Sequence, residues 1–260
     1  MIGWDVFLWF GGAAVLFSAL ASIMSMLSFR KIAIVSGLIS ILILLTYIAG
    51  FWIALDRPPL RTTGETRLWY SFFASVAGLL TYVRWRYKWI ISFSTVLSTV
   101  FILLNILKPE IHDQTLMPAL QSVWFIPHVT VYMFSYSLLG CAFLISLVVL
   151  SSRKNIDRCM QMMSAADTLI YIGAAFLTFG MLSGALWAKQ AWGHYWSWDM
   201  KETWALITWL CYMLYIHLRL LRRGNCSIWC ILLIFAFVCL QMCWWGVNLL
   251  PAAKDSMHVY

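Results

Sequence analysis

Eight apolar runs follow one another along this chain, and most are long enough to cross a bilayer as an α-helix, which takes about 20 apolar residues. Only 11% of the residues are charged, whereas a soluble domain carries roughly 25%. We therefore predict an all-α, polytopic membrane protein, with about eight transmembrane helices in a single integral domain over residues 1–260. The predicted spans are 5–29, 32–55, 68–83, 89–107, 127–150, 168–188, 202–221 and 227–250.

Basic residues concentrate on one side of the predicted membrane. The connectors that follow odd-numbered spans carry eleven Lys and Arg against two Asp, while the other side, which includes both termini, carries seven basic and eight acidic residues. Because cytoplasmic loops are enriched in Lys and Arg, we expect both termini on the outer face of a bacterial inner membrane or an equivalent membrane. This topology explains the net charge of +8, so the charge predicts no nucleic-acid binding.

The connector before the seventh predicted span reads WGHYWSWD, and we call it the tryptophan segment. Trp and Tyr are enriched at membrane interfaces, and the alternative is a platform for a flat aromatic ligand. As a short amphipathic helix, the segment would place residues 192, 196 and 199 on one face. Asp199 is also suited to cap the N-terminus of the following span. The candidate binding residues are Trp192, Gly193, Trp196, Trp198 and Asp199.

Histidine is the usual axial ligand of haem iron, and predicted topology sorts the histidines of this chain. His128 and His258 lie on the outer side and flank the tryptophan segment in sequence. His217 lies inside the seventh span, where an ionisable group indicates function by default. Each also has a plainer interpretation: an interfacial histidine is solvated and needs no ligand, and His217 is near enough to the basic edge to reach the headgroups.

Seven cysteines fall mostly inside apolar runs, and two pairs, Cys226 with Cys230 and Cys239 with Cys243, are spaced four residues apart. We interpret them as small packing residues of membrane helices. The sequence contains neither CxxC nor CxxCH, so covalent haem attachment to this chain through that motif is not expected.

The tryptophan segment resembles the WGxxWxWD signature of the haem-handling proteins of cytochrome c biogenesis. The resemblance continues in WGHYWSWDMKETWALITWL, where Met200 stands at a position often held by proline in that family. LMPALQSVWFIPHVTVYMFSYSLLG is similar to the family's stretch around its first external histidine, and WWGVNLLPAAKDSMHVY is similar to the segment ending in its second. Order and spacing resemble the CcsA (ResC) branch of System II over about 110–260, and the first four spans match more loosely.

The resemblance implies the roles of the candidate residues. His128 and His258 would be the two axial ligands of haem b iron at the outer face, above the platform of the tryptophan segment. His217 would be the ligand of an inner haem site that a membrane partner of the CcsB (ResB) type completes. His112 and His194 match no ligand position of the family and are interpreted as ordinary.

The implied function is export of haem b to the outer face and its presentation to a CxxCH apocytochrome c, whose thiols form thioethers with the vinyl groups. The chain would then be a subunit of a haem lyase, or holocytochrome c synthase, supported by a thiol-reducing pathway. None of its residues would act as acid, base or nucleophile. The alternatives are a CcmC-like loader of a haem chaperone, typically with six spans, and a membrane b-type electron-transfer cytochrome.

Overall fold

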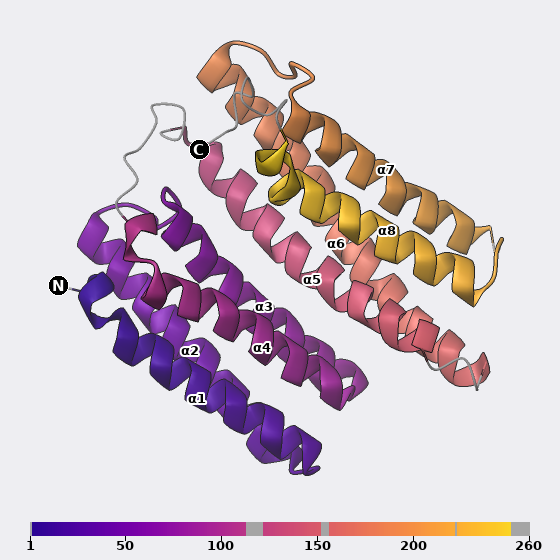
Figure 1. Ribbon diagram of the computed structural model, residues 1–260, viewed down its shortest axis with the longest axis horizontal. Helices are drawn as coiled ribbons and strands as arrows, with labels where there is room; N and C mark the ends of the chain where they lie inside the picture. Colours follow the sequence, from indigo (N-terminus) through magenta and orange to yellow (C-terminus); the bar gives the residue numbers. More distant parts are fainter. Residues whose placement is uncertain (1, 113–121, 152–155, 222, 251–260) are drawn as a thin grey trace. The chain divides into compact units, whose positions relative to one another are not determined.

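The computed structural model describes residues 2–112, 122–151, 156–221 and 223–250 (Figure 1). Within these ranges the chain forms eight long α-helices and no strand, which confirms the predicted all-α class. Short 3-10 turns adjoin α1, α4 and α8. The α-helices are α1 (Phe7–Met26), α2 (Arg30–Leu55), α3 (Thr63–Trp85), α4 (Lys88–Leu107), α5 (Phe125–Ser151), α6 (Ile156–Trp192), α7 (Met200–Leu220) and α8 (Cys226–Trp244).

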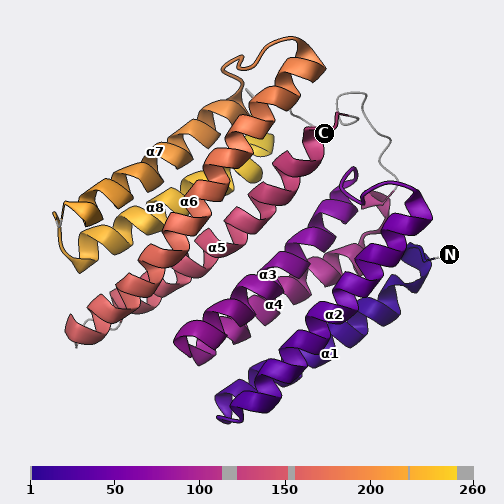
Figure 2. The same ribbon diagram turned by 180° about the vertical axis from the view of Figure 1, so that it is seen from behind.

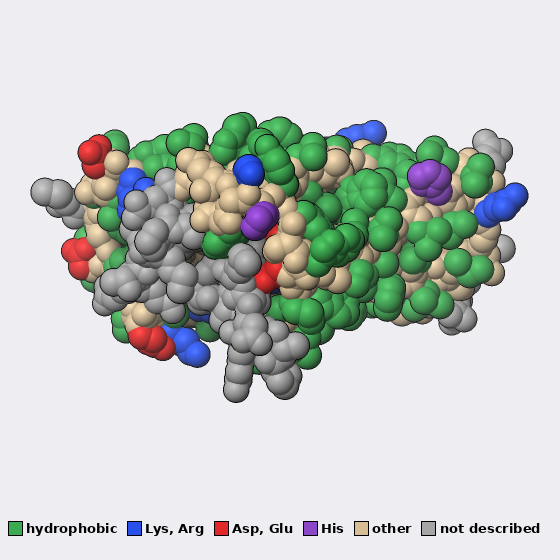
Figure 3. Space-filling view, turned by 90° about the horizontal axis from the view of Figure 1, so that it is seen from above, with side chains coloured by type: hydrophobic (Ala, Val, Ile, Leu, Met, Phe, Trp, Pro, Cys, Tyr) green, Lys and Arg blue, Asp and Glu red, His purple; other side chains and the backbone are tan. Residues whose placement is uncertain are grey.

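Six helices in the described ranges, α1, α2, α4, α5, α6 and α8, are long and apolar enough to cross a membrane by length and composition. Hydrophobic side chains also dominate the face of the molecule shown in Figure 3. The chain is therefore a multi-pass membrane protein. The other two helices, α3 and α7, both begin with a capping box, in which polar groups close the first turn. Eight spans and outer termini stay predictions.

Contacts within the chain divide it into two compact units, unit 1 (Met1–Gln121) and unit 2 (Ser122–Tyr260), and each is described by itself. In unit 1, α1–α4 form an antiparallel bundle (Figures 1 and 2). Its interior is rich in hydroxyl groups that donate to backbone carbonyls, as Ser40 does to Ala14 at 2.8 Å and Ser98 to Ser71 at 3.0 Å. Small residues with satisfied hydroxyls let membrane helices pack closely.

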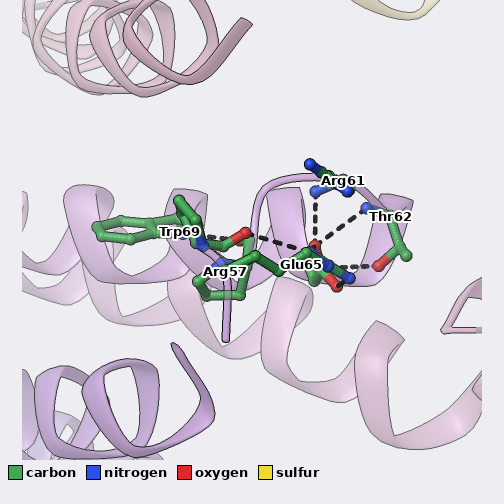
Figure 4. Close-up of polar contacts among 7 residues, drawn as sticks. Arg57, Arg61, Thr62, Glu65 and Trp69 are labelled. Atoms are coloured by element: carbon green, nitrogen blue, oxygen red, sulfur yellow. Dashed lines mark hydrogen bonds and ion pairs between the residues drawn. The ribbon is translucent and has the colours of Figure 1, made fainter. Parts of the chain in front are cut away.

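The connector before α3 folds against the helix through one buried carboxylate (Figure 4). Glu65 is 2% exposed and accepts hydrogen bonds from both terminal nitrogens of Arg57, at 3.0 and 2.8 Å. The backbone N–H groups of Arg61 and Thr62 donate to it at 2.5 and 3.2 Å. Because this capping box starts α3 at Thr63, the predicted start near residue 68 is wrong by several residues.

In unit 2, α5–α8 form a second antiparallel bundle, in which α5 packs on α6 and α8, and α7 packs on α8 and α6 (Figures 1 and 2). The helix α6 has 37 residues and measures about 55 Å, longer than its predicted span of 168–188. One end of this bundle, called the aromatic end, holds the starts of α5 and α7 and the ends of α6 and α8. The opposite end holds the last turn of α7 and the start of α8.

Candidate functional site

His128 lies half-buried in the first turn of α5, at the aromatic end of unit 2. Its Nδ1 is 2.8 Å from the carbonyl oxygen of Gly180 on α6. A carbonyl oxygen only accepts, so this contact places the ring proton on Nδ1 and the lone pair on Nε2. Metal-binding histidines are commonly held in this way, by a hydrogen bond from the second ring nitrogen to a carbonyl. The tautomer of His128 therefore fits a ligand of haem iron.

Two glycines of α6 allow the rings of α5 to approach this closely. A Cβ on Gly184 would lie 2.6 Å from Nδ1 of His128, and a Cβ on Gly180 would lie 2.3 Å from the ring of Tyr132. Tyr132 in turn packs against His128, with ring centroids 4.5 Å apart. Neither glycine was singled out in the sequence, although GMLSG has the small-xxx-small spacing that marks close helix contacts.

A buried tryptophan connects His128 to the tryptophan segment. Trp187 is 2% exposed, and its ring centroid lies 5.5 Å from that of His128 and 4.9 Å from that of Trp192. The ring of Phe125 packs against Trp187 from the first turn of α5, at 5.2 Å. The structure thus connects His128 with Trp192 through Trp187, a residue outside the tryptophan segment.

The predicted short helix over the tryptophan segment is wrong. Trp192 is the last residue of α6, and the chain from Gly193 to the start of α7 is irregular. Gly193 has φ of +85°, the left-handed conformation that commonly ends helices at glycine. The Lys189 ammonium donates to the Gly193 carbonyl at 2.7 Å and closes the turn. Residues 192, 196 and 199 therefore do not share a helical face.

Trp196 and Trp198 of the connector form an edge-to-face pair, with ring centroids 5.8 Å apart and an interplanar angle of 85°. Trp198 is 69% exposed and has φ of +59°, which is uncommon for a residue with a side chain. Trp196 is half-buried, and its indole N–H has no hydrogen-bond partner among the described residues. An aromatic pair with one exposed ring at a bundle end suits contact with a ligand or a partner.

The predicted cap at Asp199 is confirmed. Its carboxylate accepts from the N–H of Lys201 at 2.8 Å, and Glu202 completes a capping box. The same Glu202 oxygen accepts from the backbone N–H of Ser197 at 2.8 Å and from that of Asp199 at 3.2 Å. These bonds tie the irregular connector to the first turn of α7. Burial lowers the pKa of the nearby Lys201 ammonium, because loss of contact with water disfavours the charged form.

His217 lies on α7 near the other end of unit 2 and is exposed. Its Nδ1 is 2.8 Å from the carbonyl oxygen of Met213, one turn earlier on the same helix. The same reasoning assigns the lone pair to Nε2. The structure therefore places His217 and His128 toward opposite ends of unit 2, and their roles as inner and outer ligands stay predictions.

The other candidates have separate positions. His194 is exposed in the connector, and His112 stacks on Trp4 in unit 1, with ring centroids 3.8 Å apart. His258 lies outside the described residues, so its pairing with His128 stays a prediction. The seven cysteines form no disulfide bond in the described structure. The part of the chain that the structure describes contains no group of three His, Cys, Asp or Glu suited to a metal ion.

Fold and site together define a multi-pass helical membrane protein with a tryptophan-lined histidine at one end of a helical bundle. A family model described as cytochrome c assembly protein matches residues 5–253. The chain belongs to this family, which confirms the resemblance noted in the tryptophan segment.

Curated relatives include the cytochrome c biogenesis protein CcsA of Trachelium caeruleum, 30% identical over 85% of this chain and 84% of that protein. The protein of the same name from Panax ginseng is 32% identical, with the same coverage of 85% and 84%. CcsA of Chlamydomonas reinhardtii is 37% identical over 64% of this chain and 48% of its own length. Among solved structures, cytochrome c heme lyase CcmF shares the fold, with a TM-score of 0.68 at 15% identity, over 92% of this chain and 46% of that one.

Proposed function

We propose that this chain moves haem b across the membrane in cytochrome c assembly and presents it at the aromatic end of unit 2 for attachment to apocytochrome c. The observation that carries the proposal is His128, whose ring is fixed by the Gly180 carbonyl with the lone pair on Nε2. Family membership supports the pathway. On this proposal the aromatic end and both termini face the outside of a bacterial inner membrane or its equivalent.

The residues of the aromatic end fit haem as a substrate. Haem is a flat, apolar ring with two propionates, and such ligands bind in aromatic surroundings with a few placed polar groups. Trp192, Trp196 and Trp198 supply ring surface, and Lys201 supplies a partly buried positive charge for a propionate. His128 would be one axial ligand of the iron, and His258 the other.

In this proposal the chain positions the reactants and does no acid–base or nucleophilic chemistry. Each thioether forms when a thiol of the CxxCH motif adds its S–H bond across a vinyl double bond, so the addition needs no oxidant. What the site contributes is a fixed orientation of the vinyl edge toward the incoming thiols, which removes the entropic cost of alignment. The thiols must arrive reduced, so a thiol-reducing pathway belongs to the proposal.

His217 would receive haem at the inner end of unit 2. It is exposed, and no second histidine lies beside it in the described part of unit 2. A six-coordinate bis-histidine site therefore needs a ligand from another molecule, which we assign to a membrane partner of the CcsB type. A loader of a haem chaperone would need the aromatic end but no ligation, and an electron-transfer cytochrome would keep its haem permanently.

The test uses the chain purified together with its partner. We expect a low-spin, bis-histidine b-type spectrum. A His128→Ala variant should lose holocytochrome c by more than about tenfold, because loss of a mere outer-shell partner of a metal ligand already costs that much. Added imidazole should partly restore haem in a His128→Gly variant. His194→Ala, at the same end and exposed, is the matched control and should mature cytochrome c normally. Unchanged holocytochrome yield in the His128→Ala, His258→Ala double variant would contradict the proposal.

A further inference from the structure

The helix α7 has two opposite faces of different character. Residues four, seven and eleven positions apart lie on one side of a helix, and a shift of two residues turns by about 200°. One strip is buried or nearly so: Thr208, Tyr212, Tyr215 and Arg219. The strip opposite is exposed: Leu210, Leu214, His217 and Leu221. His217 therefore lies opposite the face that packs into the bundle.

Polar contacts with α6 hold the buried strip on both sides of His217. Asp167 of α6 accepts from the Tyr215 hydroxyl at 2.6 Å and from Nε of Arg219 at 2.8 Å. A second Arg219 nitrogen pairs with the other oxygen of the same carboxylate. We call Asp167, Tyr215 and Arg219 the α7 clamp. Since Tyr215 and Arg219 stand two residues before and after His217, the clamp fixes the helix at the level of that histidine.

The clamp also reaches α8. The Arg219 guanidinium lies over the ring of Trp229, 4.2 Å from its centroid. The Trp229 indole N–H donates to the carbonyl of Arg223 at 2.8 Å, in the connection between α7 and α8. Arg219 is thus held between two neighbouring helices, and its side chain is only 11% exposed.

We infer that the α7 clamp is a positioning device for His217: it sets the rotation of α7 and so keeps the imidazole on the exposed face, where a partner's ligand can reach the same haem. This inference rests on the proposed inner haem site. In lipid, apolar burial does not select which face of a helix turns inward, so close packing and interhelical polar contacts do. A buried ion pair adds little net stability, but a bidentate Arg–carboxylate pair has a strict geometry.

The experiment removes the clamp without leaving a lone buried charge. In the full chain with its partner, and with the outer site disabled by His128→Ala, the double variant Asp167→Asn, Arg219→Gln is compared with His217→Gly. We expect both variants to lose low-spin haem. The double variant should lose it by about fivefold, the scale of the interaction between residues in contact. Added imidazole should restore part of the haem in both. Thr178→Val is the control. It removes the hydrogen bond that Trp209 of α7 donates to Thr178 of α6 at 2.8 Å. Trp209 lies about 15 Å along α7 from the clamp residue Arg219.

The outcomes separate the two proposals. Unchanged haem in His217→Gly would overturn the inner site itself. Loss in His217→Gly with full haem in the double variant would overturn the clamp. Haem loss in a well-folded double variant that imidazole does not restore would also overturn it, because the defect would not be a displaced ligand. If the double variant fails to accumulate, Arg219→Lys is measured instead, since lysine keeps the positive charge but cannot make the two parallel hydrogen bonds of a guanidinium. A normal spectrum in this variant would contradict positioning by the clamp.

Discussion

His128 and His217 both donate from Nδ1 to a backbone carbonyl at 2.8 Å, but the two carbonyls belong to different helices. His128 bonds across the bundle, to Gly180 on α6. His217 bonds to Met213, within its own helix. His128 is half-buried against Tyr132 and Trp187, whereas His217 is exposed.

The difference shows two ways in which a helical bundle can fix the orientation of an imidazole ring. The direction of His128 depends on how closely α5 approaches α6, because the bond partner is on the other helix. The direction of His217 depends on the rotation of α7, because its bond turns with the helix. Changes in the α5–α6 contact should therefore affect the outer site alone, and changes in the α7 clamp should affect the inner site alone.

The largest expected effect comes from Gly184→Leu. The new side chain would occupy the space of the His128 ring, since even a Cβ would lie 2.6 Å from Nδ1. Overpacking of this kind costs roughly 1–3 kcal/mol, and the strain acts directly on the ligand. We expect nearly complete loss of haem at the outer site in optical spectra, with the His217-dependent haem retained. Gly12→Ala is the control, because a Cβ there meets nothing within 4 Å.

Equal loss at both sites would mean that the α5–α6 contact supports the whole bundle, and the comparison between the two histidines would fail. A milder Gly184→Ala variant would then show whether the response grows with the size of the side chain, as direct displacement of the ring requires.

A smaller effect is expected from Gly193→Ala. A Cβ at this position meets nothing within 4 Å, so the cost is the left-handed backbone alone, about 1–2 kcal/mol. The end of α6 should shift and weaken outer haem binding several-fold, measured by haem titration, while the inner site is unchanged. Gly193→Asn should be milder, because asparagine tolerates this conformation. Equal affinity in wild type and the alanine variant would show that the turn does not position the tryptophans.

Local signals in the sequence predicted much of this structure. Apolar runs located the eight long helices of the described ranges, and six of these are long and apolar enough to cross a membrane. The place of Asp199 just before the seventh predicted span predicted the cap of α7, because capping depends on neighbours in sequence. The part of Glu202 in that cap was not predicted. The predicted helix over the tryptophan segment failed at Gly193, where the aromatic spacing fitted a helix but the backbone turns left-handed.

Contacts between helices could not be predicted in the same way. Trp187 and Gly184 support His128 from positions almost sixty residues later in the chain, and nothing in one sequence specifies that register. In the sequence, Asp167 and Arg219 are only two of the charges on the predicted cytoplasmic side, yet they form a largely buried pair across 52 positions. Pairing of this kind is set by tertiary packing, which is why the clamp became visible only in the structure.

The smallest expected effect comes from Glu202→Gln, which tests whether the capping box orders the connector as well as the helix. The neutral amide keeps one accepting oxygen. The carboxylate oxygen that now accepts from Ser197, at 2.8 Å, and from Asp199, at 3.2 Å, loses its charge. The expected cost is about 0.5–1 kcal/mol, or a few-fold weaker outer haem binding with normal inner haem. Glu65→Gln is the matched control, because it alters the capping box of α3 in the same way. It should lower stability, since Glu65 is also paired with Arg57 at 2.8 Å. It should leave the haem affinity of the outer site unchanged. If Glu202→Gln weakens haem binding at both sites equally, the start of α7 and the rotation of α7 are coupled. The orientations of His128 and His217 would then depend on the same contacts.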